Sequence, residues 1–236
     1  MKIAIEAQRI FRKKKHGMDI VILEALRELQ RQDTFNEYYI FVAPGPDKCL
    51  EKTSNFHIVE VKCPSYILWE QIGLPRAVSK IKPDVLHCTS NTAPLFVNVP
   101  LIVTLHDIIF LEKQQSSNKS LYQNLGRIYR KLVVPQILSK SNKIITVSDF
   151  ERENICKKTN IPPSQVVTIH NGYNKRFHYI PNYHDVTKKY IEEDNYILFF
   201  GNTDPKKNTL RTIKAYALYL EKSDYKRPLL ILDINK

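Results

Sequence analysis

Several common catalytic signatures are missing from this sequence of 236 residues. It contains no P-loop, no G-x-G-x-x-G fingerprint, no H-E-x-x-H helix and no G-x-S-x-G turn. Its four cysteines are scattered without a C-x-x-C pair, so we expect reduced packing thiols and no metal framework. Walker-type nucleotide hydrolysis, ordinary dinucleotide chemistry and serine hydrolysis therefore lose support.

Long hydrophobic runs are missing as well. The longest candidate, PLIVTLHDIIFL at residues 100–111, is interrupted by His106 and Asp107. It is shorter than the ~18 apolar residues of a membrane-spanning helix. At the N-terminus, Glu6 comes early and the basic cluster follows the apolar residues, which is the reverse of a signal peptide. These features predict a cytoplasmic protein.

Acidic residues are too few to balance the basic ones. The sequence has 36 Lys and Arg against 24 Asp and Glu, a net charge of +12. Such an excess favours an anionic partner, which is a nucleic acid, an acidic membrane surface or a phosphorylated small molecule, over a generic basic surface. Nucleic acid has little support, because no recognised motif for it appears and basic residues alternate with acidic ones outside Arg12–Lys15.

Short apolar segments alternate with segments of helical periodicity. This alternation predicts an α/β fold with a Rossmann-like, doubly wound parallel sheet and helices on both faces. Near-continuous apolar strands such as residues 101–105 fit burial on both sides. The expected strands are 2–7, 37–44, 56–61, 84–88, 101–106, 143–148 and 166–171. The expected helices are 18–31, 68–81, 119–139 and a short one from Asp149, with Ser148 or Asp149 as its N-cap.

The pattern changes after residue 172. A polar, Tyr-rich, aperiodic stretch predicts an interdomain linker over residues 173–195. A strand at 196–200, a helix at 206–221 and a further strand at 228–234 then restart the alternation. We therefore expect a first domain over 1–172 and an incomplete second α/β domain over 196–236, too short to bury a core of its own.

The ends of the expected strands supply candidate site residues, because ligands of doubly wound sheets bind outside the carboxyl ends of the strands. Gly17, which follows the basic run Arg12–Lys15, would let a phosphate approach the backbone amides of the next helix. His87 ends one strand, and His106 with Asp107 ends the next. An imidazole there can bind a sugar hydroxyl or stabilise charge at a reacting centre. An ordinary turn and packing histidines are the alternatives.

Two adjacent lysines precede the helix expected at 206–221. With Asn208 as its N-cap, Lys206 and Lys207 lie just before the first turn, where positive charge opposes the helix dipole. A bound diphosphate removes this conflict, because amides, dipole and ammonium groups then favour the same anion. The alternative is a pair of solvated lysines in a turn.

Five segments in this order resemble the retaining family-4 glycosyltransferases, which have the two-domain GT-B fold. They are GMDIVILEALREL, LIVTLHDIIFL, KIITVSDFERENI, VVTIHNGYNKRF and ILFFGNTDPKKNTLRTIKAY, and the resemblance covers essentially the whole chain. It implies that the first domain faces the acceptor and that the second begins the nucleotide-sugar domain.

The resemblance also assigns roles to residues. It implies a catalytic role for His106, donor diphosphate binding by Gly17, Lys206 and Lys207, and a hinge or turn at Asn171 and Gly172. From their places beside these residues and at the strand ends, we also expect a catalytic role for Asp107, diphosphate binding by Gly201, and acceptor or phosphate contacts by Arg12, Lys15 and His87. Many family members have an Arg where this sequence has Asn202, so Lys206 would supply that charge. The family's E-x(7)-E glutamate pair is absent, so we expect the sequence to be a fragment.

By this resemblance the enzyme transfers a sugar from a nucleoside diphosphate sugar to an acceptor hydroxyl with retention. It would need no cofactor or metal, and the absence of a D-x-D motif agrees. The acceptor would be a glycan or lipid-linked, as in surface polysaccharide or glycolipid synthesis, with a mannosyltransferase as the most similar kind. The basic surface would hold the enzyme at the inner face of an anionic membrane. The alternative is an inactive folded fragment that serves as an acceptor-side or interaction domain.

Overall fold

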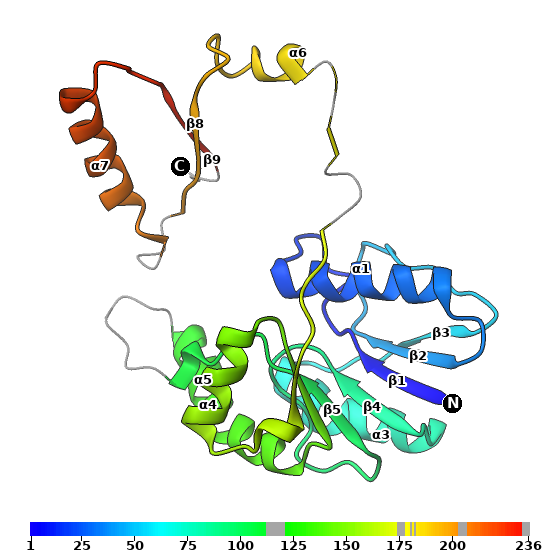
Figure 1. Cartoon of the computed structure of the whole chain (residues 1–236). Helices are drawn as coiled ribbons and strands as arrows, with labels where there is room; N and C mark the ends of the chain where they lie inside the picture. Colours follow the sequence, from blue (N-terminus) through cyan, green and yellow to red (C-terminus); the bar gives the residue numbers. More distant parts are fainter. Residues whose placement is uncertain (112–120, 174–177, 180, 182, 203–206, 233–236) are drawn as a thin grey trace. The chain divides into compact units, whose positions relative to one another are not determined.

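The computed structural model describes residues 1–111, 121–173, 178–179, 181, 183–202 and 207–232 (Figure 1). The chain divides into two compact units, Met1–Asn174 and Lys175–Lys236. Residues 175–195 of the expected linker therefore belong to the second unit.

The first unit is built on a sheet of seven strands in the order β3-β2-β1-β4-β5-β6-β7, and every neighbouring pair is parallel. The predicted doubly wound parallel sheet is confirmed. The strand order reverses between β1 and β4, the position at which such sheets bind ligands. The strands are β1 (Lys2–Glu6), β2 (Glu37–Val42), β3 (Phe56–Glu60), β4 (Val85–Cys88), β5 (Leu101–Thr104), β6 (Lys143–Thr146) and β7 (Val166–Thr168).

Helices cover the sheet between these strands. They are α1 (Gly17–Gln32), α2 (Tyr66–Leu68), α3 (Leu74–Ile81), α4 (Leu121–Lys140) and α5 (Asp149–Thr159), with short turns at η2 (Ile109–Leu111) and η3 (Pro163–Gln165). The helix expected at 68–81 differs, because it contains a π-helical turn, η1 (Trp69–Gly73). Its last residue packs so tightly that a Cβ on Gly73 would lie 2.7 Å from the Cys63 Sγ atom. None of the described helices is long and apolar enough to cross a membrane.

The core follows from the alternation of side chains along each strand. On β1, Ala4 belongs to a buried cluster with residues of α3, whereas Ile5 belongs to a second cluster with residues of α1. Figure 1 shows α1 and α3 on opposite faces of this part of the sheet. A third cluster joins α4 and α5 to β6 and β7. The first unit therefore buries apolar side chains on both faces of its sheet.

The second unit contains α6 (Tyr183–Thr187), β8 (Ile197–Phe200), α7 (Thr209–Lys222) and β9 (Leu229–Leu232). Strands β8 and β9 pair in parallel. Helix α6 lies within the stretch expected to be an aperiodic linker, and α7 begins three residues later than expected. Asn208 is the N-cap of α7, in a left-handed conformation with φ 56° and without a side-chain capping bond.

Candidate functional site

The carboxyl ends of β1 and β4 are joined by a buried carboxylate. Glu6, the last residue of β1, is 4% exposed. Its side chain accepts hydrogen bonds from the backbone N–H of Gln8 at 2.9 Å and of Thr89 at 3.1 Å. The Thr89 hydroxyl also donates to the Glu6 carbonyl at 2.8 Å. These bonds fix the start of the loop after β4 against the end of β1.

His106 follows the carboxyl end of β5 and is held by that loop. Its backbone N–H donates to the Asn91 Oδ1 atom at 2.7 Å, and its ring Nε2 lies 3.0 Å from the Thr89 carbonyl oxygen. Because a carbonyl can only accept, Nε2 carries the proton and Nδ1 is left as an acceptor. Burial lowers the pKa of His106 below 6.5, although the hydrogen bond to Thr89 and the charge of Asp107 oppose the shift. The ring is therefore neutral at pH 7.

Asn91 has the backbone conformation that this contact requires. Its φ is 67°, in the left-handed region that asparagine tolerates better than most residues. The residue is 5% exposed, and its N–H donates to the Thr104 carbonyl at 3.1 Å. This places the Asn91 side chain where it can accept from the His106 backbone.

The π-helical turn η1 holds the same loop from its other end. The Glu70 carboxylate, in a residue that is 3% exposed, accepts from the Thr92 hydroxyl. The neighbouring Gln71 accepts from the Leu95 N–H at 2.9 Å and donates to the Ala93 carbonyl at 3.1 Å. The loop that positions His106 is therefore fastened by β1 at its start and by η1 at residues 92–95.

Hydroxyl groups complete the surroundings of Glu70. Tyr66 donates to its carboxylate at 2.7 Å, and Tyr129 of α4 donates to its other oxygen. Burial raises the pKa of Glu70, while these hydrogen bonds oppose the rise. The contacts tie α2, η1 and α4 together, so Glu70 acts on the site through the loop that it holds.

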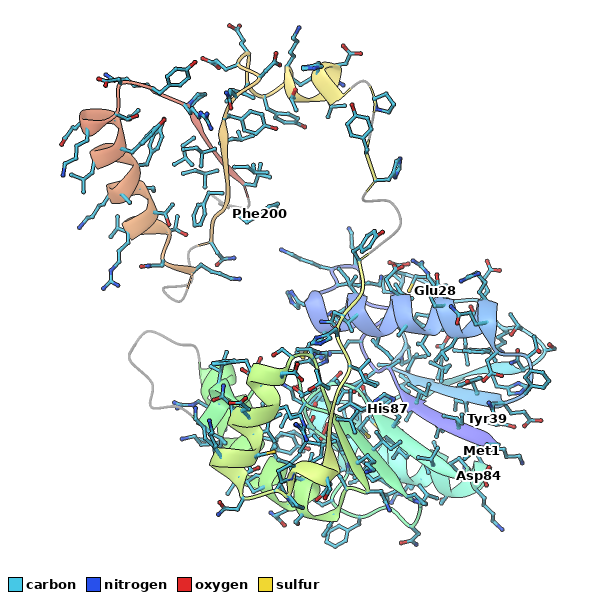
Figure 2. The ribbon with its side chains drawn as sticks, in the orientation of Figure 1. Met1, Glu28, Tyr39, Asp84, His87 and Phe200 are labelled. Carbon is cyan, nitrogen blue, oxygen red and sulfur yellow. The ribbon has the colours of Figure 1, made fainter. Side chains whose placement is uncertain are left out.

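His87 lies on β4 (Figure 2) and bonds to a neighbouring strand. Its Nε2 atom is 2.8 Å from the Thr104 hydroxyl oxygen. Burial lowers the pKa of His87 to about 4, with a smaller contribution from the nearby His106. The ring is thus neutral at physiological pH, and its Nε2 atom is engaged by the Thr104 hydroxyl within the sheet. The expected contact of His87 with the sugar acceptor or a phosphate stays a prediction.

The turn between β1 and α1 carries excess positive charge. The Arg9 Nε atom lies 3.1 Å from Asp19 Oδ1, and the Arg12 guanidinium pairs with Oδ2. The Asp19 side chain is 1% exposed and also accepts from the His16 N–H at 2.7 Å. Two guanidinium groups therefore share one carboxylate beside the N-terminus of α1. Gly17 opens this helix, and a Cβ there would have no atom within 4 Å.

Three other predicted residues of the first unit already have structural contacts. The Lys15 ammonium pairs with Asp47, as Arg12 pairs with Asp19. Asp107 accepts from the Ile109 N–H at 3.2 Å and so caps the turn η2. The expected hinge residues Asn171 and Gly172 are exposed near the end of the unit. The roles assigned to all of these residues stay predictions.

The remaining predicted residues belong to the second unit. Gly201 is buried, and its N–H donates to the Leu232 carbonyl at 2.8 Å. Lys207 is exposed just before α7, and Lys206 lies outside the described residues. The Asn202 backbone exchanges two hydrogen bonds with the Thr209 hydroxyl, at 3.0 and 2.7 Å, which closes the turn between β8 and α7.

Sequence patterns missed the residues that hold His106 in place, which are Glu6, Glu70, Thr89 and Asn91. They also missed the pairing of Arg9 with Asp19 in the β1–α1 turn. One signal was present. An acidic residue at the carboxyl end of an apolar strand, as in KIAIE, indicates a buried polar contact there. The partner of that contact is 83 residues away and carries no local signature.

Comparisons with known proteins identify the family and the fold of the chain. Residues 16–177 match the sequence model of the family described as Glycosyltransferase Family 4. The solved structure of WaaG, a glycosyltransferase involved in lipopolysaccharide biosynthesis, superposes with a TM-score of 0.64 at 14% identity. It covers 97% of this chain, and this chain covers 62% of WaaG.

Two further structures have the same fold. HepE from Anabaena, solved with UDP-glucose, has a TM-score of 0.58 at 13% identity. The superposition includes 99% of this chain and 69% of the HepE chain. A glycosyltransferase from Rickettsia africae has a TM-score of 0.52 at 15% identity and covers 98% and 68%. No curated protein sequence matches. The family match spans more than half of the residues of this chain, and the chain therefore belongs to Glycosyltransferase Family 4.

Proposed function

We propose that the protein transfers a sugar from a nucleoside diphosphate sugar to an acceptor hydroxyl, with retention at the anomeric carbon. Family membership supports sugar transfer in general, and the neighbour HepE binds UDP-glucose. The observation that carries the proposal is His106, a neutral imidazole held by Thr89 and Asn91 at the carboxyl end of β5. This is the edge at which doubly wound sheets bind ligands.

In this proposal His106 orients the sugar. Because its Nε2–H is committed to the Thr89 carbonyl, the Nδ1 lone pair is the atom that accepts a sugar hydroxyl. A neutral ring does this better than an imidazolium, which has no lone pair to offer. The lowered pKa of His106 therefore supports this role at neutral pH.

The diphosphate would bind at the N-terminus of α1. Arg9 and Arg12 together carry one more charge than the Asp19 carboxylate that they share, and this excess and the helix dipole both favour an anion there. The fold does not need a glycine at position 17 for space, and close approach of a phosphate gives a reason for one. Lys207, with Lys206, would neutralise the departing diphosphate. Catalysis would then rest on positioning and charge stabilisation.

The donor and the pathway are proposed more specifically from the neighbours. HepE was solved with UDP-glucose, whereas the sequence around His106 resembles mannosyltransferases, which use GDP-mannose. WaaG acts in lipopolysaccharide biosynthesis, which supports a glycan or lipid-linked acceptor in the synthesis of a surface polysaccharide or glycolipid. Neither a cofactor nor a metal ion is required by this proposal.

Calorimetric titration of the chain with UDP, GDP, UDP-glucose and GDP-mannose tests the donor site. We expect one base to bind, and Gly17→Ala to weaken it roughly tenfold, which is about 1.4 kcal/mol. Because a Cβ at residue 17 would have no atom of the described residues within 4 Å, we expect this change to leave the fold intact. Gly126→Ala in α4 is the matched control, since a Cβ there is equally free of contacts within the described part of the chain.

Lys207→Ala extends the same titration to the second unit and should also weaken binding. Failure of every nucleotide to bind, or equal binding by the Gly17→Ala variant, would contradict the proposed donor site. A product assay with the donor that binds, followed by nuclear magnetic resonance of the anomeric proton, tests retention. An inverted product would reject retention while leaving sugar transfer in place.

A further inference from the structure

Gln8 is a buried glutamine whose side-chain oxygen is not used by the fold. The residue is 7% exposed, and its Oε1 atom is buried without a hydrogen bond to any of the described residues. Its backbone is engaged on both sides, because its N–H donates to the Glu6 carboxylate and its carbonyl accepts from the Ala43 N–H, both at 2.9 Å. A buried carboxamide oxygen without a donor weakens a fold, so stability does not explain this side chain.

The next residue, Arg9, has unused hydrogen-bond donors. Its Nε atom lies 3.1 Å from Asp19 Oδ1, but its Nη2 atom is buried and has no partner within the described part of the chain. The Nε atom of Arg12, which shares the Asp19 carboxylate, is unpartnered in the same way. The turn after β1 therefore holds unused N–H donors together with one excess positive charge, which is a combination that suits an anion.

A chain of hydrogen bonds joins Gln8 to His106. The Glu6 carboxylate accepts from the Gln8 N–H with one oxygen and from the Thr89 N–H with the other. The Thr89 carbonyl in turn lies 3.0 Å from the His106 Nε2 atom. Burial is the main cause of the lowered pKa of His106, and the charge of Arg9 adds to it, so the guanidinium lies near the imidazole. The unused groups and His106 therefore share one place, at the carboxyl ends of β1, β4 and β5.

These groups fit one class of ligand. The Gln8 Oε1 and His106 Nδ1 atoms are hydrogen-bond acceptors, and a sugar hydroxyl can donate to each of them. The unused guanidinium donors of Arg9 and Arg12 suit the oxygens of a phosphate. Inorganic phosphate would leave the two acceptors unpaired, and a neutral sugar would leave the donors unpaired. A sugar that carries a phosphate uses both sets.

We propose that Gln8 and Arg9 bind the glycosyl phosphate of the donor, with Gln8 on a sugar hydroxyl and Arg9 on the phosphate attached to the anomeric carbon. Gln8 is then a residue that determines sugar specificity. A sugar that lacks this hydroxyl, or has it on the other face of the ring, leaves the buried oxygen of Gln8 unpaired and binds more weakly. The proposal rests on the proposed function in naming the donor, but its test uses no nucleotide.

Titration with small phosphates, followed by nuclear magnetic resonance of the protein, measures this subsite. We expect glucose 1-phosphate or mannose 1-phosphate to bind roughly tenfold more tightly than inorganic phosphate. Gln8→Met should remove that advantage and leave the binding of inorganic phosphate unchanged. Arg9→Gln should weaken both ligands roughly tenfold. Arg31→Gln, at an exposed arginine of α1, is the matched control and should bind both as the unchanged chain does.

The stability of the variants separates a binding role of Gln8 from a structural one. Because the Gln8 Oε1 atom has no partner among the described residues, Gln8→Met should leave the urea midpoint of unfolding unchanged or raise it. Gln165 is the matched control, since its carboxamide donates to the carbonyls of Leu138 and Ser141. Gln165→Met should lower the midpoint and leave the binding of sugar phosphates unchanged.

Three outcomes would overturn the proposal. The first is that neither sugar 1-phosphate binds more tightly than inorganic phosphate. The second is that Gln8→Met lowers the urea midpoint as Gln165→Met does and leaves ligand binding unchanged, because Gln8 would then serve the fold. The third is tighter binding of glucose 6-phosphate than of either 1-phosphate, which would indicate a phosphorylated acceptor. If only the nucleotides fail to bind, the proposed nucleotide donor falls and the sugar-phosphate subsite stands. If only the sugar phosphates fail, the reverse holds.

Discussion

Both units contain a strand, a helix and a parallel strand in succession, but they bury the apolar side chains of these elements to different extents. In the first unit, α4 between β5 and β6 buries four aliphatic side chains among its described residues, and three of the four residues of β5 are buried. In the second unit, α7 between β8 and β9 buries none, and no residue of β8 or β9 is buried. Leu210, Ile213 and Leu218 of α7 are 67%, 42% and 52% exposed. Figure 2 labels Phe200 at the end of β8, and it is 68% exposed.

The comparison shows that strand and helix patterns specify local structure, whereas burial requires layers on both sides of a sheet. Seven strands with helices on both faces enclose three buried clusters in the first unit. A pair of strands and one long helix can cover only one face. We therefore expect the first unit to supply most of the stability of the chain.

The largest difference should appear when matched helix leucines are shortened. Leu26 of α1 is fully buried, and Leu26→Ala should reduce the free energy of unfolding by about 2–5 kcal/mol through lost burial and a cavity. Leu218→Ala, on the half-exposed α7 position, should change it by less than about 0.5 kcal/mol. Urea unfolding followed by Trp69 fluorescence and by circular dichroism checks both. A cost at Leu218 equal to that at Leu26 would show that the second unit has a core in solution.

What the sequence could predict in each unit follows from this contrast. Apolar runs and helical periodicity are local, so the seven strands of the first sheet and the helix at 119–139 were placed within a few residues. The predicted cap of α5 is confirmed, because the Ser148 hydroxyl accepts from the Glu151 N–H. The π-helical turn was missed, because the pattern of apolar residues there is that of an ordinary helix. Its last residue, Gly73, leaves no room for a side chain, since a Cβ would lie 2.7 Å from the Cys63 Sγ atom, and that neighbour is not visible from the local sequence.

The candidate site was predictable only in part. His106 was found because a polar residue at the end of an apolar strand is visible in the sequence. Its supports were not, because Thr89 acts through its backbone carbonyl, and the Asn91 side chain reaches the His106 N–H only because its backbone is left-handed. Arg12 and Lys15 were visible as charge, but their partners Asp19 and Asp47 depend on how the loops fold.

A change of intermediate size should come from pH and should be confined to the first unit. The pKa of His87 is about 4 in the fold and about 6.5 in an unfolded chain, so below pH 6.5 the unfolded chain takes up a proton first. Burying the neutral His87 ring therefore costs nothing in protonation above pH 6.5, and the free energy of unfolding decreases as the pH falls from 6.5 toward 4. The decline amounts to at most roughly 3 kcal/mol. His87→Gln should flatten the pH dependence measured by urea unfolding with Trp69 fluorescence.

His184 is the matched control for this measurement. It lies partly exposed in the second unit, where its Nδ1 atom is 2.8 Å from Asp194 Oδ1. His184→Gln should leave the Trp69 transition unchanged at every pH, because Trp69 reports the first unit. If both variants flatten the curve equally, the acid sensitivity does not arise from burial of His87.

The smallest expected effect compares two asparagines with left-handed backbones, one in each unit. Asn91 has a φ of 67° and Asn208 a φ of 56°, so glycine fits either backbone without strain. Asn91→Gly removes the acceptor of the His106 N–H and should reduce stability by about 1–2 kcal/mol. Asn208→Gly removes a side chain without a capping bond and should change stability by only a few tenths of a kcal/mol.

Nuclear magnetic resonance of the His106 ring separates a positioning role of Asn91 from a general loss of stability. If Asn91 holds the imidazole against the Thr89 carbonyl, Asn91→Gly should weaken the signal of the Nε2 proton and raise the pKa of His106 toward 6.5, because a less firmly buried ring is protonated more easily. Asn208→Gly should leave both unchanged. An unaltered His106 titration in folded Asn91→Gly protein would show that the loop fastened by Glu6 and Glu70 orients the ring without the Asn91 side chain.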